Sequence, residues 1–551
     1  MAYDNMGRLI GSTTQYSFLT GHTFSNSYAY DPASNRTSLT LPDASSNTYQ
    51  YDTLNRLKSL TDSVTGQFNF GYDTLSRRAS LTRPNGVNTS YGYDSLSRLL
   101  NVLHKTGTTT LDGATYTYDN AGNRTAKTNS LNSVTEQYTY DPLYQLTKAV
   151  QGATTTESYN YDSVGNRLSS LGVSSYSYNS SNELTSNSAA SFTYDNNGNT
   201  LTKTDSTGTR NHTWDFENRL ASVVLPGSGG TVTFKYDPFG RRIQKSAPSG
   251  TTNYLYDGAD LIEELDSGGN ELARYAQGPG VDEPLAELRS GATGFYDADG
   301  LGSVTSLSGN TGTLSNTYTY DAFGNLTAST GSLGNPLQYT GRDYDPETGL
   351  RYYRARYYDP GVGRFISEDP IGFEGGLDFY TYGENDPINS IDPSGLRDII
   401  IVVWNQKGSS AGHTGAFELN GDTILSQFPK DCHCPTGHNV PLSWKDTLKE
   451  EGRDPDRIFR VHIPDENDKA FDKVAANHRK RPVWNWYPMK IEFYETNCVF
   501  AVTRALNAGG IPTPDYDWPG SLGDDLAGKA NAKGKPWTVT PLPKVPWPAP
   551  K

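Results

Sequence analysis

Two aspartates that begin matching turn sequences are the first residues with chemical potential. Asp369 opens "DPIGF" and Asp392 opens "DPSGL", and 18 residues separate the two motifs. Aspartyl proteolysis needs one protonated and one ionised carboxylate around a water, and two such turns brought together supply that pair. Asp-Pro-x-Gly is also an ordinary turn, with Asp at position i and Pro at i+1. The residues alone leave both interpretations open.

A cysteine and a histidine nearer the C-terminus form a second candidate constellation. Cys498 lies in the predicted first turn of a helix, where the positive end of the helix dipole favours a thiolate. His413 lies on a predicted strand and has the chemistry of its general base. Ser426, if the hairpin has a two-residue turn, or Gln427, if it has a bulge, is expected to share the strand face of His413. The alternative is an inert core cysteine and a surface histidine.

A third set of residues offers soft metal ligands. Cys432, Cys434 and His438 occur in "KDCHCPTGH", a spacing that suits zinc thiolate and imidazole ligands. No second ligand pair stands at a structural-finger distance, so a loop that carries these residues by chance, or a redox-sensitive pair, competes with this interpretation. With His462 or His478 added, the set makes a catalytic metal centre of the nuclease class. We favour a protein without a cofactor and keep zinc as the alternative.

Composition changes abruptly between the two groups of candidates. Of 37 tyrosines, 34 lie in residues 1–396, whereas seven of eight tryptophans and all three cysteines lie after it. Acidic residues outnumber basic ones by 42 to 27 before Arg397, and basic residues lead by 20 to 19 from there on, which sums to the net charge of −14. An acidic first part does not suit nucleic-acid binding, which needs clustered Lys and Arg. Three cysteines in this length do not make a disulfide framework.

The first 396 residues are built from one repeat. "YDPASNRTSL", "YDTLNRLKSL", "YDTLSRRASL" and "YDSLSRLLNV" begin 21 residues apart, and further copies continue to Tyr320. Each unit reads as a strand, a turn opened by Asp and a second strand, and Gly122 is expected to supply a positive φ in "YTYDNAGNRTAK". Tyrosines at this spacing are expected to form ladders on one face of a continuous sheet. A generic β-solenoid or adhesive repeat is the alternative.

These repeats resemble the Rhs/YD-repeat family and are similar to the C component of insecticidal toxin complexes. The stretch from Tyr344 to Leu396 resembles the Rhs-associated core that ends such shells. The resemblance implies a mainly β fold in which repeats spiral into a hollow cocoon around a C-terminal toxin. The implied domains are YD repeats at 1–343, the core at 344–396 and a toxin domain at 397–551.

The same resemblance assigns roles to the paired turns. In that family two Asp-Pro-x-Gly-Leu motifs cut the chain directly after the second Leu. Carried onto this chain, Asp369 and Asp392 are the acid/base pair, and the bond between Leu396 and Arg397 is cut. Arg364, in "GRFISEDP", is expected to hold one carboxylate ionised through a charge-assisted contact.

The last 155 residues are expected to make a small α+β domain. "RDIIIVVW" predicts a buried strand and "GHTGAFELNGDTILSQ" a hairpin closed at Asn420-Gly421, while the tail from Pro512 onward reads as loops. The strand histidine followed by "TNCVFAVTRAL" resembles the permuted papain-like superfamily, which includes NlpC-type amidases and lecithin-retinol acyltransferase-like enzymes. That resemblance implies a cysteine hydrolase or acyl transferase, with Cys498 as nucleophile and His413 as base.

The whole chain is therefore expected to be a toxin made in the bacterial cytoplasm and delivered to target cells in bacterial competition. No apolar run is long enough to span a bilayer, and the start "AYDNMGRLI" lacks the features of a signal peptide. The family resemblance implies delivery machinery, of the type VI secretion kind, and a cognate immunity protein. A metal-dependent nuclease toxin and a non-enzymatic surface adhesin are the competing hypotheses.

Overall fold

The computed structural model describes residues 1–372 and 377–396, together with the backbone of five later strands, at 399–404, 413–418, 423–426, 457–462 and 538–542. The chain divides into two compact units. The first is Met1–Asp369 with Gly376–Gly395, and the second is Pro370–Gly375 with Leu396–Lys551. The first unit therefore holds the predicted repeats and the predicted core region as far as Gly395, except residues 370–375.

The first sheet has 16 antiparallel strands that pair strictly in chain order. Each strand continues the sheet through a tight turn, because every repeat contributes one hairpin. Its strands are β1 (Ala2–Tyr3), β2 (Leu9–Thr14), β3 (Phe24–Tyr30), β4 (Arg36–Thr40), β5 (Ser46–Tyr51), β6 (Leu57–Asp62), β7 (Gly66–Tyr72), β8 (Arg78–Thr82), β9 (Val87–Tyr93), β10 (Leu99–Thr106), β11 (Thr109–Tyr118), β12 (Arg124–Asn129), β13 (Thr135–Tyr140), β14 (Leu146–Gln151), β15 (Thr154–Tyr161) and β16 (Arg167–Ser170).

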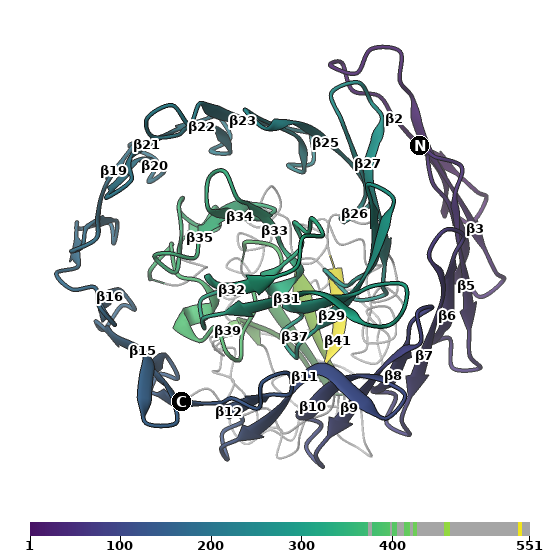
Figure 1. Ribbon diagram of the computed structural model, residues 1–551, viewed down its shortest axis with the longest axis horizontal. Helices are drawn as coiled ribbons and strands as arrows, with labels where there is room; N and C mark the ends of the chain where they lie inside the picture. The colour runs from purple at the N-terminus through teal and green to yellow at the C-terminus, as the bar shows by residue number, and fades with distance from the viewer. Residues whose placement is uncertain are drawn as a thin grey trace, which may run out of the picture. The chain divides into compact units, whose positions relative to one another are not determined.

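The second sheet repeats this plan with another 16 strands in chain order. Figure 1 shows the strands from β2 to β27 following one another around a ring, with β29 to β35 lying inside it in this view. The strands are β17 (Ser177–Tyr178), β18 (Leu184–Ser186), β19 (Ala190–Tyr194), β20 (Thr200–Asp205), β21 (Gly208–Trp214), β22 (Leu220–Val224), β23 (Thr231–Tyr236), β24 (Arg242–Ala247), β25 (Gly250–Asp257), β26 (Asp260–Leu265), β27 (Glu271–Gln277), β28 (Pro284–Arg289), β29 (Ala292–Ala298), β30 (Val304–Ser308), β31 (Leu314–Tyr320) and β32 (Leu326–Thr330).

A small four-stranded sheet follows and packs against the inner face of the second sheet. Leu350 and Tyr352 belong to the same buried cluster as Leu220 and Val232 of β22 and β23. The inner sheet and the second of two short 3-10 turns belong to the predicted core region, and the first turn precedes it. They are η1 (Tyr339–Gly341), β33 (Asp343–Asp345), β34 (Leu350–Tyr353), β35 (Arg356–Asp359), β36 (Arg364–Phe365) and η3 (Gly383–Asn385).

In most of the Tyr-Asp pairs the aspartate organises a hairpin turn. After β5, Asp52 Oδ1 accepts hydrogen bonds from the backbone N–H groups of Leu54 and Arg56, at 2.9 and 3.0 Å. Asn55 in this turn has a φ of 57°, and Gly122 has a φ of 98° at the same place in its repeat, as predicted. The carboxylate satisfies backbone donors that the turn leaves free, so residues other than glycine adopt the left-handed conformation there.

Tyrosines and arginines join each repeat to the next. Arg56 pairs with Asp52 of its own turn and lies over the ring of Tyr72, 4.6 Å from the centroid. The Tyr72 hydroxyl donates to the Leu57 carbonyl at 2.9 Å. The predicted ladder on one face is therefore a ladder of ring–guanidinium and hydroxyl–carbonyl contacts. The hydroxyl contact recurs at Tyr30, Tyr93, Tyr118, Tyr140, Tyr161 and Tyr194.

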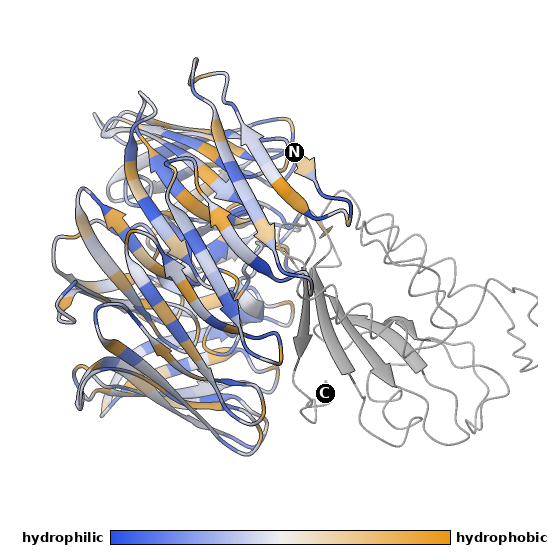
Figure 2. Ribbon diagram, turned by 90° about the vertical axis from the view of Figure 1, so that its right-hand side faces the viewer, coloured by the Kyte–Doolittle hydropathy of each residue, from blue (hydrophilic) through white to orange (hydrophobic). Residues whose placement is uncertain are grey.

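The late strands of the second sheet pack on the early strands of the first. Side chains alternate between apolar and polar along the strands, as Figure 2 shows by colour. Phe68 of β7 and Phe295 of β29 are both buried, with ring centroids 6.1 Å apart. Arg274 of β27 and Asp62 of β6 form a buried ion pair of 2.7 Å. We call this junction of β25–β29 with β3–β9 the seam.

The second unit contains a five-stranded antiparallel sheet in the order β39-β38-β37-β40-β41. The predicted strand and hairpin are present as the first three of its strands. The expectation of loops after Pro512 is wrong at β41, which pairs with β40 because its alternating Thr and Val suit an edge strand. The bounds are β37 (Ile399–Trp404), β38 (His413–Glu418), β39 (Thr423–Ser426), β40 (Arg457–His462) and β41 (Thr538–Leu542).

Candidate active site

The two predicted aspartates meet at one buried arginine. Arg356, the first residue of β35, has its Nη2 atom 2.8 Å from Asp369 Oδ2 and 3.4 Å from Asp392 Oδ2. The side chain of Arg356 is 2% exposed and lies over the Phe365 ring, 3.7 Å from its centroid. A guanidinium that is removed from water attracts a nearby carboxylate more strongly than an exposed guanidinium does. The pair of turns therefore does bring two carboxylates to one place.

Each aspartate is also held by further hydrogen bonds, Asp392 within its own turn and Asp369 by a later part of the chain. Asp392 Oδ1 accepts hydrogen bonds from the Gly395 N–H at 2.8 Å and from the Ser394 hydroxyl at 3.3 Å. The N–H of Asp369 donates to the carbonyl of Phe379 at 3.0 Å. Asp392 thus belongs both to an ordinary Asp-Pro-x-Gly turn and to a pair of carboxylates. The turn leaves the second carboxylate oxygen of Asp392 facing Arg356.

The backbone that leads to the predicted cut is bound residue by residue. Arg354 donates to the Pro393 carbonyl, the Ala355 N–H donates to the Ser394 carbonyl at 3.1 Å, and Arg356 Nε donates to the Gly395 carbonyl at 2.6 Å. The Leu396 side chain that follows is buried. Three consecutive carbonyls are therefore positioned by the turn between β34 and β35.

Gly395 is required by this geometry. Its φ is 72°, and a Cβ atom placed on it would lie 2.4 Å from the Tyr353 carbonyl oxygen and 3.0 Å from the Arg356 backbone nitrogen. A side chain at this position would push the chain away from β35. The glycine of "DPSGL" therefore permits close approach of two backbones beside the aspartate pair.

The role given to Arg364 in the sequence analysis needs a correction. Its guanidinium forms a bidentate pair with Asp378, with both Nη–Oδ distances at 2.8 Å, and Nη2 donates to the Asn182 carbonyl at 2.9 Å. A bidentate pair uses the planar fork of the guanidinium fully, so this side chain ties the core to the turn that follows β17. Arg356 is the arginine that contacts both aspartates.

The sequence does not single out Arg356, because several nearby arginines could equally be the partner of the two aspartates. Five of them lie between residues 342 and 364, and nothing in their spacing distinguishes one from another. The distinction arises when "YYRARYY" folds into the β34–β35 hairpin, which aims Arg354 and Arg356 at the chain near Asp392.

The second constellation lies only partly within the described residues. His413 is the first residue of β38, and β38 pairs with β39 so that Gly415 is opposite Ser426. Because alternate strand positions share a face, this register places His413 and Ser426 at positions of the same face. The pairing also has a register shift between Ala416 and Phe417, so the hairpin combines the pairing expected to favour Ser426 with the bulge expected to favour Gln427. Cys498 and Gln427 lie outside the described residues, and their roles stay predictions.

The predicted zinc ligands Cys432, Cys434 and His438 also lie outside the described residues. In the part of the chain that the structure does describe, no group of three His, Cys, Asp or Glu side chains is placed to hold a metal. A helix long and apolar enough to cross a membrane is likewise absent from those residues.

Hairpins that open with Tyr-Asp, arranged in a ring and followed by an inner sheet that carries paired aspartates, define a YD-repeat shell protein. The family model described as Teneurin YD-shell matches residues 64–212 and 129–388, which together cover more than half of the 551 residues. The chain belongs to this family.

Similar proteins cover the shell in part. The tRNA3(Ser)-specific nuclease WapA of Bacillus spizizenii is 36% identical over 273 residues, 46% of this chain and 12% of that protein. Double-stranded DNA deaminase toxin A of Burkholderia cenocepacia is 29% identical over 316 residues, 51% of this chain and 22% of that protein. The chain thus spans less than a quarter of the length of either relative.

A solved structure shows the same fold. The crystal structure of TcdB2-TccC3-Cdc42 superimposes with a TM-score of 0.59 at 19% identity, over 72% of this chain and 23% of that chain. The likeness supports a mainly β shell of long antiparallel sheets. It confirms the mainly β fold expected for the repeats.

Proposed function

We propose that this chain is a polymorphic toxin of the YD-repeat class that cuts itself between Leu396 and Arg397 and so separates residues 397–551 from the shell. The observation that carries the proposal is the contact of Arg356 with both Asp369 and Asp392 while its Nε atom binds the Gly395 carbonyl, one residue before the cut. Relatives named as a nuclease and as a deaminase toxin support a released domain that is an enzyme.

The geometry suits hydrolysis by a pair of carboxyl groups. Such a pair hydrolyses a peptide bond when one carboxyl group is protonated and the other is ionised. The ionised aspartate takes a proton from water as the water oxygen bonds to the Leu396 carbonyl carbon, and the protonated aspartate donates to the carbonyl oxygen. The C–N bond then breaks: the proton taken from water passes to the Arg397 nitrogen, and the proton on the carbonyl oxygen returns to its aspartate.

Substitution of either aspartate tests this step. Asp369→Asn and Asp392→Asn keep the side-chain shape but remove the carboxylate, so we expect both chains to stay whole on a denaturing gel. The wild-type chain is expected to give a fragment whose first residue, by N-terminal sequencing, is Arg397. Asp205→Asn, which breaks an ion pair with Arg210 elsewhere in the shell, is the matched control. An uncut wild-type chain would contradict the proposal.

For the released domain we favour a cysteine hydrolase or acyl transferase. Cys498 attacks a carbonyl carbon to form an acyl-enzyme, and His413 acts first as base and then as acid, oriented by Ser426. The register of β38 and β39, which gives His413 and Ser426 positions on the same face, supports this choice. Peptide, amide and ester substrates all fit the mechanism.

A nuclease-type toxin is the second candidate, because the relatives are named as enzymes that act on tRNA and on DNA. Cys498→Ala in the full chain separates the two. We expect loss of toxicity in bacteria that express this variant, with self-cleavage unchanged. Toxicity that survives Cys498→Ala, accompanied by degraded or modified nucleic acid, would favour the second candidate.

Such a toxin requires protection of the cell that makes it and a route out of that cell. We therefore expect a cognate immunity protein that binds the released domain, and delivery machinery that recognises the shell. Copurification of the released domain with a neighbouring gene product that abolishes toxicity is the measurement that checks the first expectation.

A further inference from the structure

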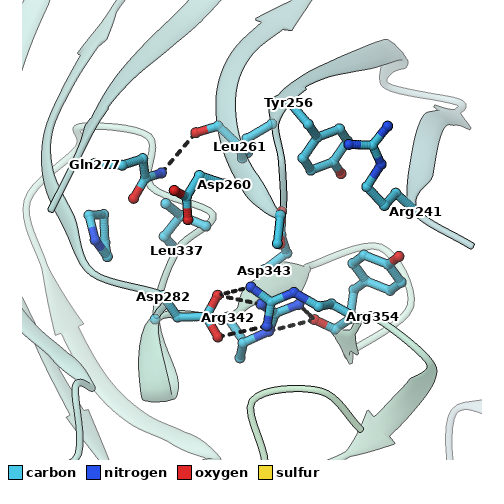
Figure 3. Close-up of a pocket in the computed structure, with 14 residues that line it drawn as sticks. Arg241, Tyr256, Asp260, Leu261, Gln277, Asp282, Leu337, Arg342, Asp343 and Arg354 are labelled. Carbon is cyan, nitrogen blue, oxygen red and sulfur yellow. Dashed lines mark hydrogen bonds and ion pairs between the residues drawn. The ribbon is translucent and has the colours of Figure 1, made fainter. Parts of the chain in front are cut away.

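A buried aspartate in the repeat region connects the seam to the candidate cleavage site. Asp282 lies in the turn between β27 and β28, where its φ is 52°. Its carboxylate accepts hydrogen bonds from Arg342 Nη1 at 2.6 Å and from Arg354 Nη2 and Nη1 at 2.6 and 3.0 Å. Figure 3 shows Asp282 facing both guanidinium groups at the edge of a small pocket. One carboxylate from the repeats thus binds two arginines, Arg354 in the core region and Arg342 just before it.

The charge state of Asp282 suits this contact. Although burial acts to raise it, the pKa of Asp282 is lowered by the nearby guanidinium groups of Arg342 and Arg354. Asp282 therefore remains ionised at neutral pH, and its two hydrogen bonds with Arg354 are charge-assisted.

Arg354 extends the connection to the chain near the cut. It occupies the turn between β34 and β35 with a φ of 56°, a left-handed conformation that only surrounding contacts maintain in a residue other than glycine. Its Nη1 atom donates both to Asp282 and to the Pro393 carbonyl. Pro393 directly follows Asp392, and the next two carbonyls are bound by Ala355 and Arg356.

The other end of the connection is the seam. Glu283, the residue after Asp282, is ion-paired with Arg78 of β8, and Arg78 Nη2 also lies 3.3 Å from Glu283 Oε2. Two adjacent residues of one turn therefore contact two different parts of the chain. Glu283 binds an early strand of the first sheet, and Asp282 binds the core region.

We infer that Asp282 and Arg354 are positioning residues that make self-cleavage depend on closure of the seam. When β28 has docked on β8, the turn that carries Glu283 also presents Asp282 to Arg354, which then holds the Pro393 carbonyl and aligns the chain from Asp392 to Leu396. Before closure Arg354 has no fixed anchor, and the scissile bond is not aligned. This order of events rests on the proposed self-cleavage. The seam of the shell closes first, and residues 397–551 are cut from the shell afterwards.

The rate of cleavage in newly made full-length chains tests this inference. We expect Asp282→Asn and Arg354→Ala to slow the appearance of the fragment that begins at Arg397 by roughly 10- to 100-fold, the size of effect that misplacement of reacting groups produces. Arg354→Lys retains a cationic donor for the Pro393 carbonyl and is expected to recover part of the rate. Asp205→Asn, at a remote ion pair of the β20–β21 hairpin, should cleave as the wild type does.

The pH profile distinguishes positioning from a change in the acid/base pair or from general unfolding. Arg354→Ala should lower the rate at every pH without moving either limb of the profile, because Asp369, Asp392 and Arg356 are unchanged. Circular dichroism should show an intact shell in both Asp282→Asn and Arg354→Lys. Wild-type rates in both Asp282→Asn and Arg354→Ala would overturn the inference.

The outcomes for the seam and for the proposed function are separable. Glu283→Gln weakens the contact with Arg78 and should slow cleavage in the same direction as Asp282→Asn; an unchanged rate would remove the link to seam closure. If the wild-type chain itself is not cut, the proposed self-cleavage fails. If the wild type is cut, and Asp282→Asn and Arg354→Ala are cut equally fast, self-cleavage stands and only the positioning role of Asp282 and Arg354 fails.

Discussion

At the scale of single residues, Arg356 does more than supply charge. One side chain contacts two carboxylates, the Gly395 carbonyl and, through Nη1 at 2.8 Å, the Phe379 carbonyl. All three nitrogen atoms of its guanidinium are thereby bound to the strands and turns around the cut. A lysine has a single ammonium group without a planar fork and is no substitute for a guanidinium with this many fixed partners.

Gly395→Ala is the sharpest test of the backbone geometry. Both Gly395 and Gly240 have a φ near 70°, but a Cβ on Gly240 meets nothing within 4 Å, whereas one on Gly395 meets the Tyr353 carbonyl oxygen at 2.4 Å. Each alanine costs about 1 kcal/mol for the left-handed conformation. We expect Gly240→Ala to cleave normally and Gly395→Ala to cleave at least about tenfold more slowly, as followed on denaturing gels. Equal rates in the two variants would contradict the close approach.

At the scale of elements, the hairpin repeat is readable from the sequence because its determinants are local. The Asp side chain, the left-handed residue three places later and the alternating strands all act within about ten residues. The same local rules predicted the strand Ile399–Trp404 and the hairpin after it. They failed at β41, where pairing with the distant β40 decides that a proline-containing stretch is a strand.

At the scale of the whole molecule, the first unit closes through contacts between residues far apart in the chain. The seam joins Asp62 to Arg274 and Phe68 to Phe295, and β15 is tied to the turn after β31 because Glu157 Oε1 accepts the Ala322 N–H at 2.9 Å. These junctions bury ionisable groups, so closure makes the stability of the shell depend on pH.

The pKa shifts of three buried acids predict that the stability of the shell falls as the pH rises. Burial and the nearby charge of Asp321 raise the pKa of Glu157 to about 8, and burial raises the pKa of Glu287 and of Asp386 to about 7. Unfolded carboxyl groups have values of about 4, so the folded shell binds these protons more tightly. Their contribution to stability is full below about pH 4 and is lost as pH rises through about 7 to 8.

We therefore expect the melting temperature of the shell to fall between about pH 6.5 and pH 8.5. His212, whose pKa is lowered by burial to about 4, is neutral in the folded shell throughout this range. About half of the unfolded imidazoles are protonated at pH 6.5, so His212 opposes the fall at the lower end of the range and has no effect above about pH 7.5. Glu157→Gln should flatten the dependence, because an amide does not titrate, whereas exposed Glu217→Gln should leave it unchanged. Differential scanning calorimetry at both pH values measures the effect. A melting temperature that rises with pH would contradict the assignment of these buried acids.

The sequence by itself determined the repeat, the turn chemistry, the compositional boundary near Leu396 and the two aspartates of the candidate site. Each of these depends on residues close together in the chain or on a motif that recurs, so no long-range information is needed. Only the tertiary structure decided that Arg356 joins those aspartates, that Arg364 pairs with Asp378, and that Asp282 reaches Arg354. The sequence does not show which carboxylate each arginine will pair with, because that depends on which strands lie next to one another in the folded shell.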